Sequence, residues 1–114
     1  MRFEDLEPVF LKLNETPFGP VQMSTVRDDA QGVMFLCPKC FADNGGPAGV
    51  HQVICWGSTV LNNSAINGPG RWDLTGYGVK DMTLVGAGAN DGIVHVNGDC
   101  DARFLIERGE VRLL

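Results

Sequence analysis

Two cysteines separated by two residues, in the segment Cys37-Pro38-Lys39-Cys40, constrain this chain more than any other feature. This spacing forms a tight knuckle that can present two sulfur atoms to one metal ion. The chain has 114 residues, and a domain of that size buries only about two thirds of its unfolded surface. Because so small a core provides limited stability, we expect a metal ion to act as a stabilising crosslink.

The chain offers four cysteines and two histidines as soft ligands. His51 and Cys55 lie on one expected strand, about 13 Å apart at roughly 3.3 Å per residue. Zinc ligands lie about 2.0 to 2.3 Å from the metal, so only one of these two can join the knuckle. His51 is nearer to the glycine-rich segment that follows Cys40. Cys55 stands between Ile54 and Trp56, as an ordinary buried residue does.

The fourth ligand is expected from the end of the chain. Cys100 follows the turn signal at residues 97–99 and opens the last expected hairpin, where a ligand can be directed at the knuckle. His95 lies inside the preceding expected strand, where a packed or hydrogen-bonded imidazole is the more common outcome. We therefore predict a closed, structural Zn²⁺ site on Cys37, Cys40, His51 and Cys100. Replacement of His51 by His95 or Cys55 stays open as an alternative.

Other roles for the cysteines are also considered. A redox dithiol of the thioredoxin type needs a helix after its first thiol. Residues 41–49 read as loop throughout, and Gly45-Gly46-Pro47 excludes a long helix. The remaining alternatives are free thiols and a disulfide framework, for which four cysteines allow three connectivities.

Composition predicts a mostly β fold within a single domain over residues 1–114. The 15 glycines and weak helix signals favour a small antiparallel β-sandwich or rolled sheet that ends in a C-terminal β-hairpin. A first strand at residues 7–13 is expected at a sheet edge, because Pro8 cannot donate to a ladder. The further expected strands are residues 22–26, 32–36, 50–56, 71–75, 82–85 and 93–96, followed by a hairpin over 103–114 that turns at Gly109.

No catalytic or phosphate-binding motif emerges. Ser24, Ser58 and Ser64 lack a nucleophile elbow, and two histidines do not indicate a triad. Residues 57–70 are expected to form a long polar loop. Residues 86–92 resemble a dinucleotide loop, but the third glycine comes one place late and a strand follows, so phosphate binding is not expected.

Charge narrows the classes of partner. Nine basic residues against fourteen acidic ones give a net charge of −5, and the basic residues are scattered. This balance disfavours direct nucleic-acid binding and an anionic membrane surface, and it suits a basic protein partner. The first residues carry no apolar signal region and no run is long enough to span a membrane, so we expect a cytoplasmic protein with reduced thiols.

The order of several short motifs resembles a known group of proteins. The motifs are Cys37-x-x-Cys40, His51-Gln-Val-Ile-Cys-Trp56, Arg71-Trp72-Asp-Leu-Thr-Gly76, Met82-Thr-Leu84, Val96-Asn-Gly-Asp-Cys100 and Phe104-Leu-Ile-x-x-Gly109-x-Val111. The group is a family of small proteins of unassigned function, common in phages and prophages and sometimes mislabelled as ammonia monooxygenase. The resemblance covers about residues 32–113. This chain departs from the family pattern at Val85-Gly86-Ala87 and at Arg103, where several members carry a histidine.

The resemblance implies a small β fold with zinc on the four ligands named above. With the acidic charge, it leads us to expect a non-enzymatic zinc-binding protein of phage or prophage origin. Such a protein would act in the host bacterial cytoplasm through protein–protein interaction, for example against a host defence protein. The alternatives are a metal-dependent enzyme with an open zinc site and a virion or assembly component.

Overall fold

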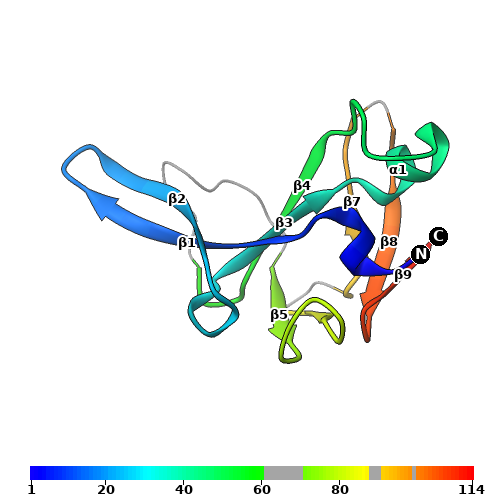
Figure 1. Cartoon of the computed structure of the whole chain (residues 1–114). Coiled ribbons are helices and arrows are strands. Elements are labelled where there is room, and N and C mark those ends of the chain that lie inside the picture. The colour runs from blue at the N-terminus through cyan, green and yellow to red at the C-terminus, as the bar shows by residue number, and fades with distance from the viewer. Residues whose placement is uncertain (61–70, 88–90, 99) are drawn as a thin grey trace.

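The computed structural model describes residues 1–60, 71–87, 91–98 and 100–114. Within these ranges the strands form three antiparallel sheets, and the chain also has one short α-helix and two 3-10 helices (Figure 1). The predicted mostly β, antiparallel fold is therefore confirmed. The predicted loop at 57–70 lies largely outside the described residues, as do residues 88–90 of the glycine-rich stretch.

The largest sheet has the strand order β2-β1-β3-β4. Its strands are β1 (Val9–Thr16), β2 (Gly19–Thr25), β3 (Gly32–Leu36) and β4 (Gln52–Trp56). The edge position predicted for the first strand is wrong, because β1 pairs with β2 on one side and with β3 on the other. Pro8 precedes the strand, so its missing N–H costs no ladder hydrogen bond. The 3-10 helix η1 (Phe3–Leu6) precedes β1 along the chain, and the 3-10 helix η2 (Arg27–Asp29) follows β2.

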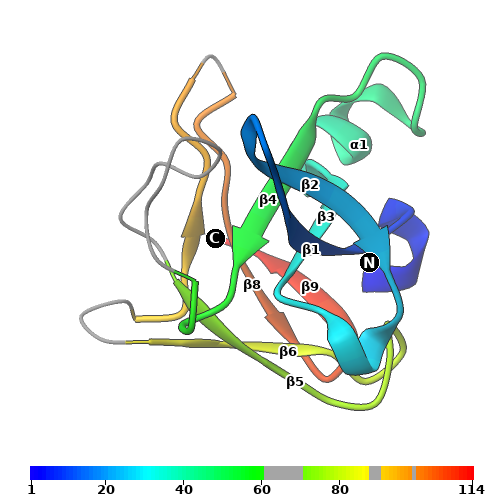
Figure 2. The ribbon, with the colours of Figure 1, turned by 90° about the vertical axis from the view of Figure 1, so that its left-hand side faces the viewer.

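Two smaller sheets complete the molecule. One pairs β5 (Trp72–Thr75) with β6 (Thr83–Gly86), and the other has the order β7-β8-β9, with β7 (Val94–His95), β8 (Arg103–Glu107) and β9 (Glu110–Leu113). The predicted C-terminal hairpin is confirmed, and Gly109 in its turn has φ 77°. The Gly109 amide donates to the Met82 carbonyl over 2.8 Å, which joins the hairpin to the start of β6 (Figure 2).

Three phenylalanines join the N-terminus, the large sheet and the last hairpin. The rings of Phe3 and Phe35 meet edge to face with centroids 5.1 Å apart, and those of Phe35 and Phe104 with centroids 5.9 Å apart. All three side chains are buried. Such edge-to-face pairs contribute about 0.5 to 1.5 kcal/mol beyond the burial of their area. This cluster sets β3, which carries the cysteine knuckle at its end, against β8.

A short α-helix follows β3, where the sequence predicted only loop. Helix α1 covers Pro38–Asn44, so the predicted loop at 41–49 is wrong in its first part. Pro38 has the fixed φ that suits a first helical residue, and Cys37 precedes it in an extended conformation. Gly45 ends the helix at φ 71°, and its amide donates to the carbonyls of Phe41 and Ala42. The helix is short, as the Gly-Gly-Pro segment predicted.

Candidate metal centre

The four predicted ligands come together in space. One sulfur each from Cys37, Cys40 and Cys100 and one imidazole nitrogen of His51 all lie within 4.8 Å of one another. The sulfurs of Cys37 and Cys100 are 4.0 Å apart, and the Cys100 sulfur lies 3.4 Å from Nε2 of His51. Among the described residues, no other group of three or more such side chains meets this test.

These distances fit a single tetrahedral ion. Tetrahedral bonds of about 2.3 Å to sulfur and 2.05 Å to nitrogen place two sulfurs about 3.8 Å apart, and a sulfur and a nitrogen about 3.6 Å apart. The observed 4.0 Å and 3.4 Å lie within about 0.2 Å of those values. These two separations suit tetrahedral coordination, so the cluster could hold a metal ion.

Three ligands are positioned by the β3–α1–β4 unit. Cys37 is the residue before helix α1, and Cys40 lies within its first turn. The Cys37 amide donates to the His51 carbonyl over 2.9 Å and so continues the β3–β4 ladder by one bond. That bond holds His51, immediately before β4, beside the knuckle. The two cysteines and the histidine thus share one local framework of backbone hydrogen bonds.

The turn between β7 and β8 carries the fourth ligand. The Val96 amide donates to the Ala102 carbonyl over 2.8 Å, which closes the turn around Cys100. Asp101 has φ 44°, a left-handed conformation that is uncommon for a non-glycine residue. Lys39, from the knuckle itself, reaches across with its Nζ to the Cys100 carbonyl over 2.6 Å. Apart from the position of Lys39 between two cysteines of the cluster, no sequence signal predicts this contact.

The thiols differ in their acidity. Partial burial raises the pKa of Cys40 to about 11, with further increases from its neighbours Cys37 and Cys100. Burial is also the largest single influence on Cys100, and it raises the pKa. Hydrogen bonds with the Ala102 amide, His51, Cys37 and Cys40 together outweigh burial, so the pKa of Cys100 is lowered. A divalent cation would favour the thiolate form of every sulfur in such a cluster.

The remaining soft ligands lie outside the cluster. Cys55 is fully buried in β4, and that burial raises the pKa of its thiol, as expected for a packed, inert cysteine. His95 forms a hydrogen bond with Asp101 through its Nε2 atom. Both outcomes follow the sequence-based expectation. The Asp101 partner of His95 is a residue for which the sequence offered no signal.

One side of the centre faces a cleft. Cys37 is buried, whereas Cys40, His51 and Cys100 line an open cleft together with Gln52, Val96, Asn97 and Gly98. His51 is an exposed residue. An ion in the centre would thus be enclosed by protein on the Cys37 side and approachable from the side of the other three ligands.

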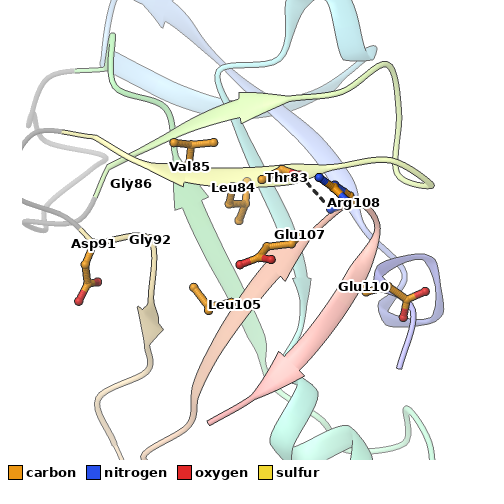
Figure 3. A pocket seen from close by; sticks show the side chains of 10 residues that line it. All are labelled: Thr83, Leu84, Val85, Gly86, Asp91, Gly92, Leu105, Glu107, Arg108 and Glu110. Atoms are coloured by element: carbon orange, nitrogen blue, oxygen red, sulfur yellow. Dashed lines mark hydrogen bonds between the residues drawn. The ribbon is translucent and has the colours of Figure 1, made fainter.

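A second concavity lies between β6 and β8 and carries no comparable arrangement. Figure 3 shows the carboxylates of Asp91, Glu107 and Glu110 spread along it, with Glu107 between Leu84 and Leu105. Glu107 and Glu110 form ion pairs with arginines, at 3.9 Å to Arg112 and 2.8 Å to Arg2. Glu107 and Glu110 therefore act as surface ion-pair partners, and the Asp91 carboxylate accepts a hydrogen bond from the Ile93 amide.

Comparison with protein-family models, curated proteins and solved structures finds no match to this chain. Among the described residues, no helix has the length and apolar character that crossing a membrane requires.

Proposed function

We propose that Cys37, Cys40, His51 and Cys100 bind one structural Zn²⁺ ion, and that the protein is a non-enzymatic, zinc-stabilised module that binds another protein. One observation carries the structural part. The cluster joins the β3–α1–β4 unit to the β7–β8 turn, which follows it by many residues along the chain. An ion at this point crosslinks the middle of the chain to its last hairpin.

The donor set favours zinc over other ions. Thiolates and imidazole suit Zn²⁺, whereas Mg²⁺ and Ca²⁺ require oxygen ligands. Three sulfurs and one nitrogen fill a tetrahedron, so no position is left for water or substrate. A closed site of this kind contributes to folding rather than to catalysis.

Elemental analysis tests the metal. Protein purified without added metal should contain one zinc per chain, and Cys37→Ser should contain much less. Cys55→Ser is the matched control, because Cys55 is buried outside the cluster, and it should retain its zinc. Equal zinc loss from both variants, or iron in place of zinc, would contradict the assignment.

The binding role is supported by charge and by the resemblance to phage and prophage proteins. A net charge of −5 gives the protein an acidic field that attracts a basic partner, such as a host defence protein that itself binds nucleic acid. Tagged protein should retain a basic bacterial protein from host lysate at low salt and lose it as ionic strength rises. A zinc-stripped sample is the control. Failure to capture a specific partner from the lysate of any plausible host would count against this role.

The cleft favours a second candidate function, a metal-dependent enzyme. Because Cys40, His51 and Cys100 all line the cleft, loss of one bond to the ion would open a coordination position toward solvent. X-ray absorption at the zinc edge separates the two functions. Three sulfurs and one nitrogen around zinc support the structural site, whereas an oxygen in place of one of them supports catalysis.

A further inference from the structure

The outer edge of strand β2 carries an unusual set of exposed apolar side chains. Phe18 is 98% exposed and Val26 is 65% exposed, and between them Val21 and Met23 are 42% and 43% exposed. In the described part of the chain, no strand pairs with this edge, since the sheet order places β2 at the end. Figure 1 shows the β1–β2 ribbon projecting away from the rest of the molecule. We call residues 18–26 the β2 edge.

The direction of the free backbone groups follows from two hydrogen bonds. The Leu13 amide donates to the Gln31 side chain over 2.6 Å, and the Gln31 amide donates to the Leu11 carbonyl over 2.8 Å. Leu13 and Leu11 therefore direct these groups away from β2. In an antiparallel ladder, their register partners Gln22 and Ser24 then direct their own backbone groups outward, to the open side.

Pro20 occupies the third outward position in the same alternation, opposite Glu15. The Pro20 nitrogen, which has no hydrogen to donate, faces the open side. Pro20 therefore removes no hydrogen bond from the β1–β2 ladder. The open edge of β2 thus offers the carbonyls of Pro20, Gln22 and Ser24, and the amides of Gln22 and Ser24. An approaching strand can pair with all five groups.

We propose that this edge pairs with the same edge of a second copy of the chain. The two β2 strands run antiparallel about a two-fold axis at Gln22. In this register, the two Gln22 residues exchange both backbone hydrogen bonds, and each Ser24 amide donates to the Pro20 carbonyl of the second copy. One hydrogen bond is missing at each end of the interface, because Pro20 has no N–H to donate to the Ser24 carbonyl of the second copy.

The same register places the exposed apolar side chains opposite one another. Val21 faces Met23 of the second copy, and Phe18 lies across from Val26 of the second copy. All four apolar side chains of the edge therefore find apolar partners in one arrangement. Cross-strand pairs of this kind are the unit that stabilises a sheet. Because a foreign strand would have to supply this pattern from its own sequence, a second copy is the better occupant.

Charge also favours this place for self-association. Two copies, each with a net charge of −5, repel over most of their surface. Strand β2 itself, Gly19-Pro-Val-Gln-Met-Ser-Thr25, has no charged residue. The nearest charges on the neighbouring strand are Lys12, opposite Met23, and Glu15, opposite Pro20. In the proposed register, neither faces its own counterpart, so no like charges meet at the interface.

The test compares two double variants of the full, zinc-loaded chain by sedimentation. The wild type should sediment with twice the monomer mass of 12.3 kDa at high concentration. V21K/M23K sets lysine opposite lysine in this register and should weaken dimerisation at least tenfold. V21K/M23E introduces the same number of charges but sets lysine opposite glutamate, so it should retain the dimer. Zinc content and circular dichroism check that both variants are folded.

A crosslink tests the register independently of these variants. Gln22→Cys places two Cα atoms about 5.5 Å apart across the two-fold axis, within the range for a disulfide. Ser24→Cys is the control, because its two sites lie about 13 Å apart. Rapid disulfide formation by Gln22→Cys alone supports the proposal. A wild type that stays monomeric, a V21K/M23K variant that still dimerises, a V21K/M23E variant as monomeric as V21K/M23K, or equal crosslinking by both cysteine variants would overturn it.

Discussion

The ammonium group of Lys39 donates a hydrogen bond to the backbone carbonyl of Cys100 over 2.6 Å. This contact joins the knuckle directly to the β7–β8 turn. It holds Cys40, which follows Lys39, close to Cys100. Because the donor is charged and the site is partly buried, such a bond is worth about 1.5 to 3 kcal/mol at most. The cluster is therefore held together in part by a contact between protein groups alone.

Lys39→Met should lower the free energy of unfolding of the zinc-loaded protein by about 1 to 2 kcal/mol, because it removes the bond and leaves the Cys100 carbonyl without this donor. It should also weaken zinc binding, measured by competition with a chromophoric chelator. Lys80→Met, at an exposed position away from the cluster, is the matched control and should change neither quantity by more than about 0.5 kcal/mol. Wild-type values for Lys39→Met would show that the contact does not support the site.

Removal of one ligand should be far more damaging than removal of a buried thiol elsewhere. Binding of structural zinc in small domains is worth about 10 to 16 kcal/mol, which is comparable to the whole stability of a domain. Cys37→Ser should therefore leave the chain largely unfolded or insoluble. Cys55→Ser, which buries a hydroxyl in β4, should cost only about 1 to 3 kcal/mol. Urea unfolding followed by tryptophan fluorescence compares the two, and equal damage would mean that Cys55 shares the role.

The four members of the cluster could be predicted because each is marked by a local sequence signal. The spacing of Cys37 and Cys40 is a short motif, and extended-strand geometry separates His51 from Cys55. The turn signal before Cys100 indicated where the last ligand would be presented. The contact from Lys39 could not be predicted, since it depends on how the β7–β8 turn packs against helix α1.

The errors in the fold concern features whose cost depends on distant pairing. Pro20 reads as a break in a strand, yet β2 includes it because its missing N–H faces the open edge. The two-residue turn at Pro17 and Phe18 sets the β1–β2 register, and β1 is an inner strand because β3 pairs with its other side. Helix α1 differs from the expected loop for a local reason, because Pro38 is a favourable first residue for a short helix that ends at Gly45.

Asp81 should stabilise its loop independently of pH across the neutral range. The amides of Tyr77 and Gly78 donate to its carboxylate over 3.0 and 2.9 Å, and these bonds lower the pKa of Asp81 below its usual 3.8. A depressed pKa in the folded state contributes stability that is complete above the unfolded value and is lost only as pH falls below it.

Asp81→Asn should therefore lower the Tm by the same amount at about pH 5 and at about pH 8, since the carboxylate is ionised throughout this window. Differential scanning calorimetry of the zinc-loaded proteins measures the difference. Asp43→Asn, an exposed control in α1, should leave the Tm unchanged. A gap between wild type and Asp81→Asn that narrows between these pH values would contradict the depressed pKa.

Gly109 should be the least replaceable glycine among those in the described ranges. Its φ of 77° disfavours any side chain, and a Cβ atom there would collide with the Lys80 carbonyl oxygen. Its own amide and carbonyl bond to Met82 and Phe3, so the turn cannot move away without breaking contacts to β6 and to the N-terminus. Gly109→Ala should lower the free energy of unfolding by about 2 kcal/mol or more, from backbone strain together with the clash.

Gly78→Ala is the control, because φ of Gly78 is not positive and no atom lies within 4 Å of the added Cβ. It should change the free energy of unfolding by less than about 1 kcal/mol. Chemical denaturation of both variants measures the contrast, and a similar small effect of each would mean that the hairpin turn adapts and is not held in place by β6.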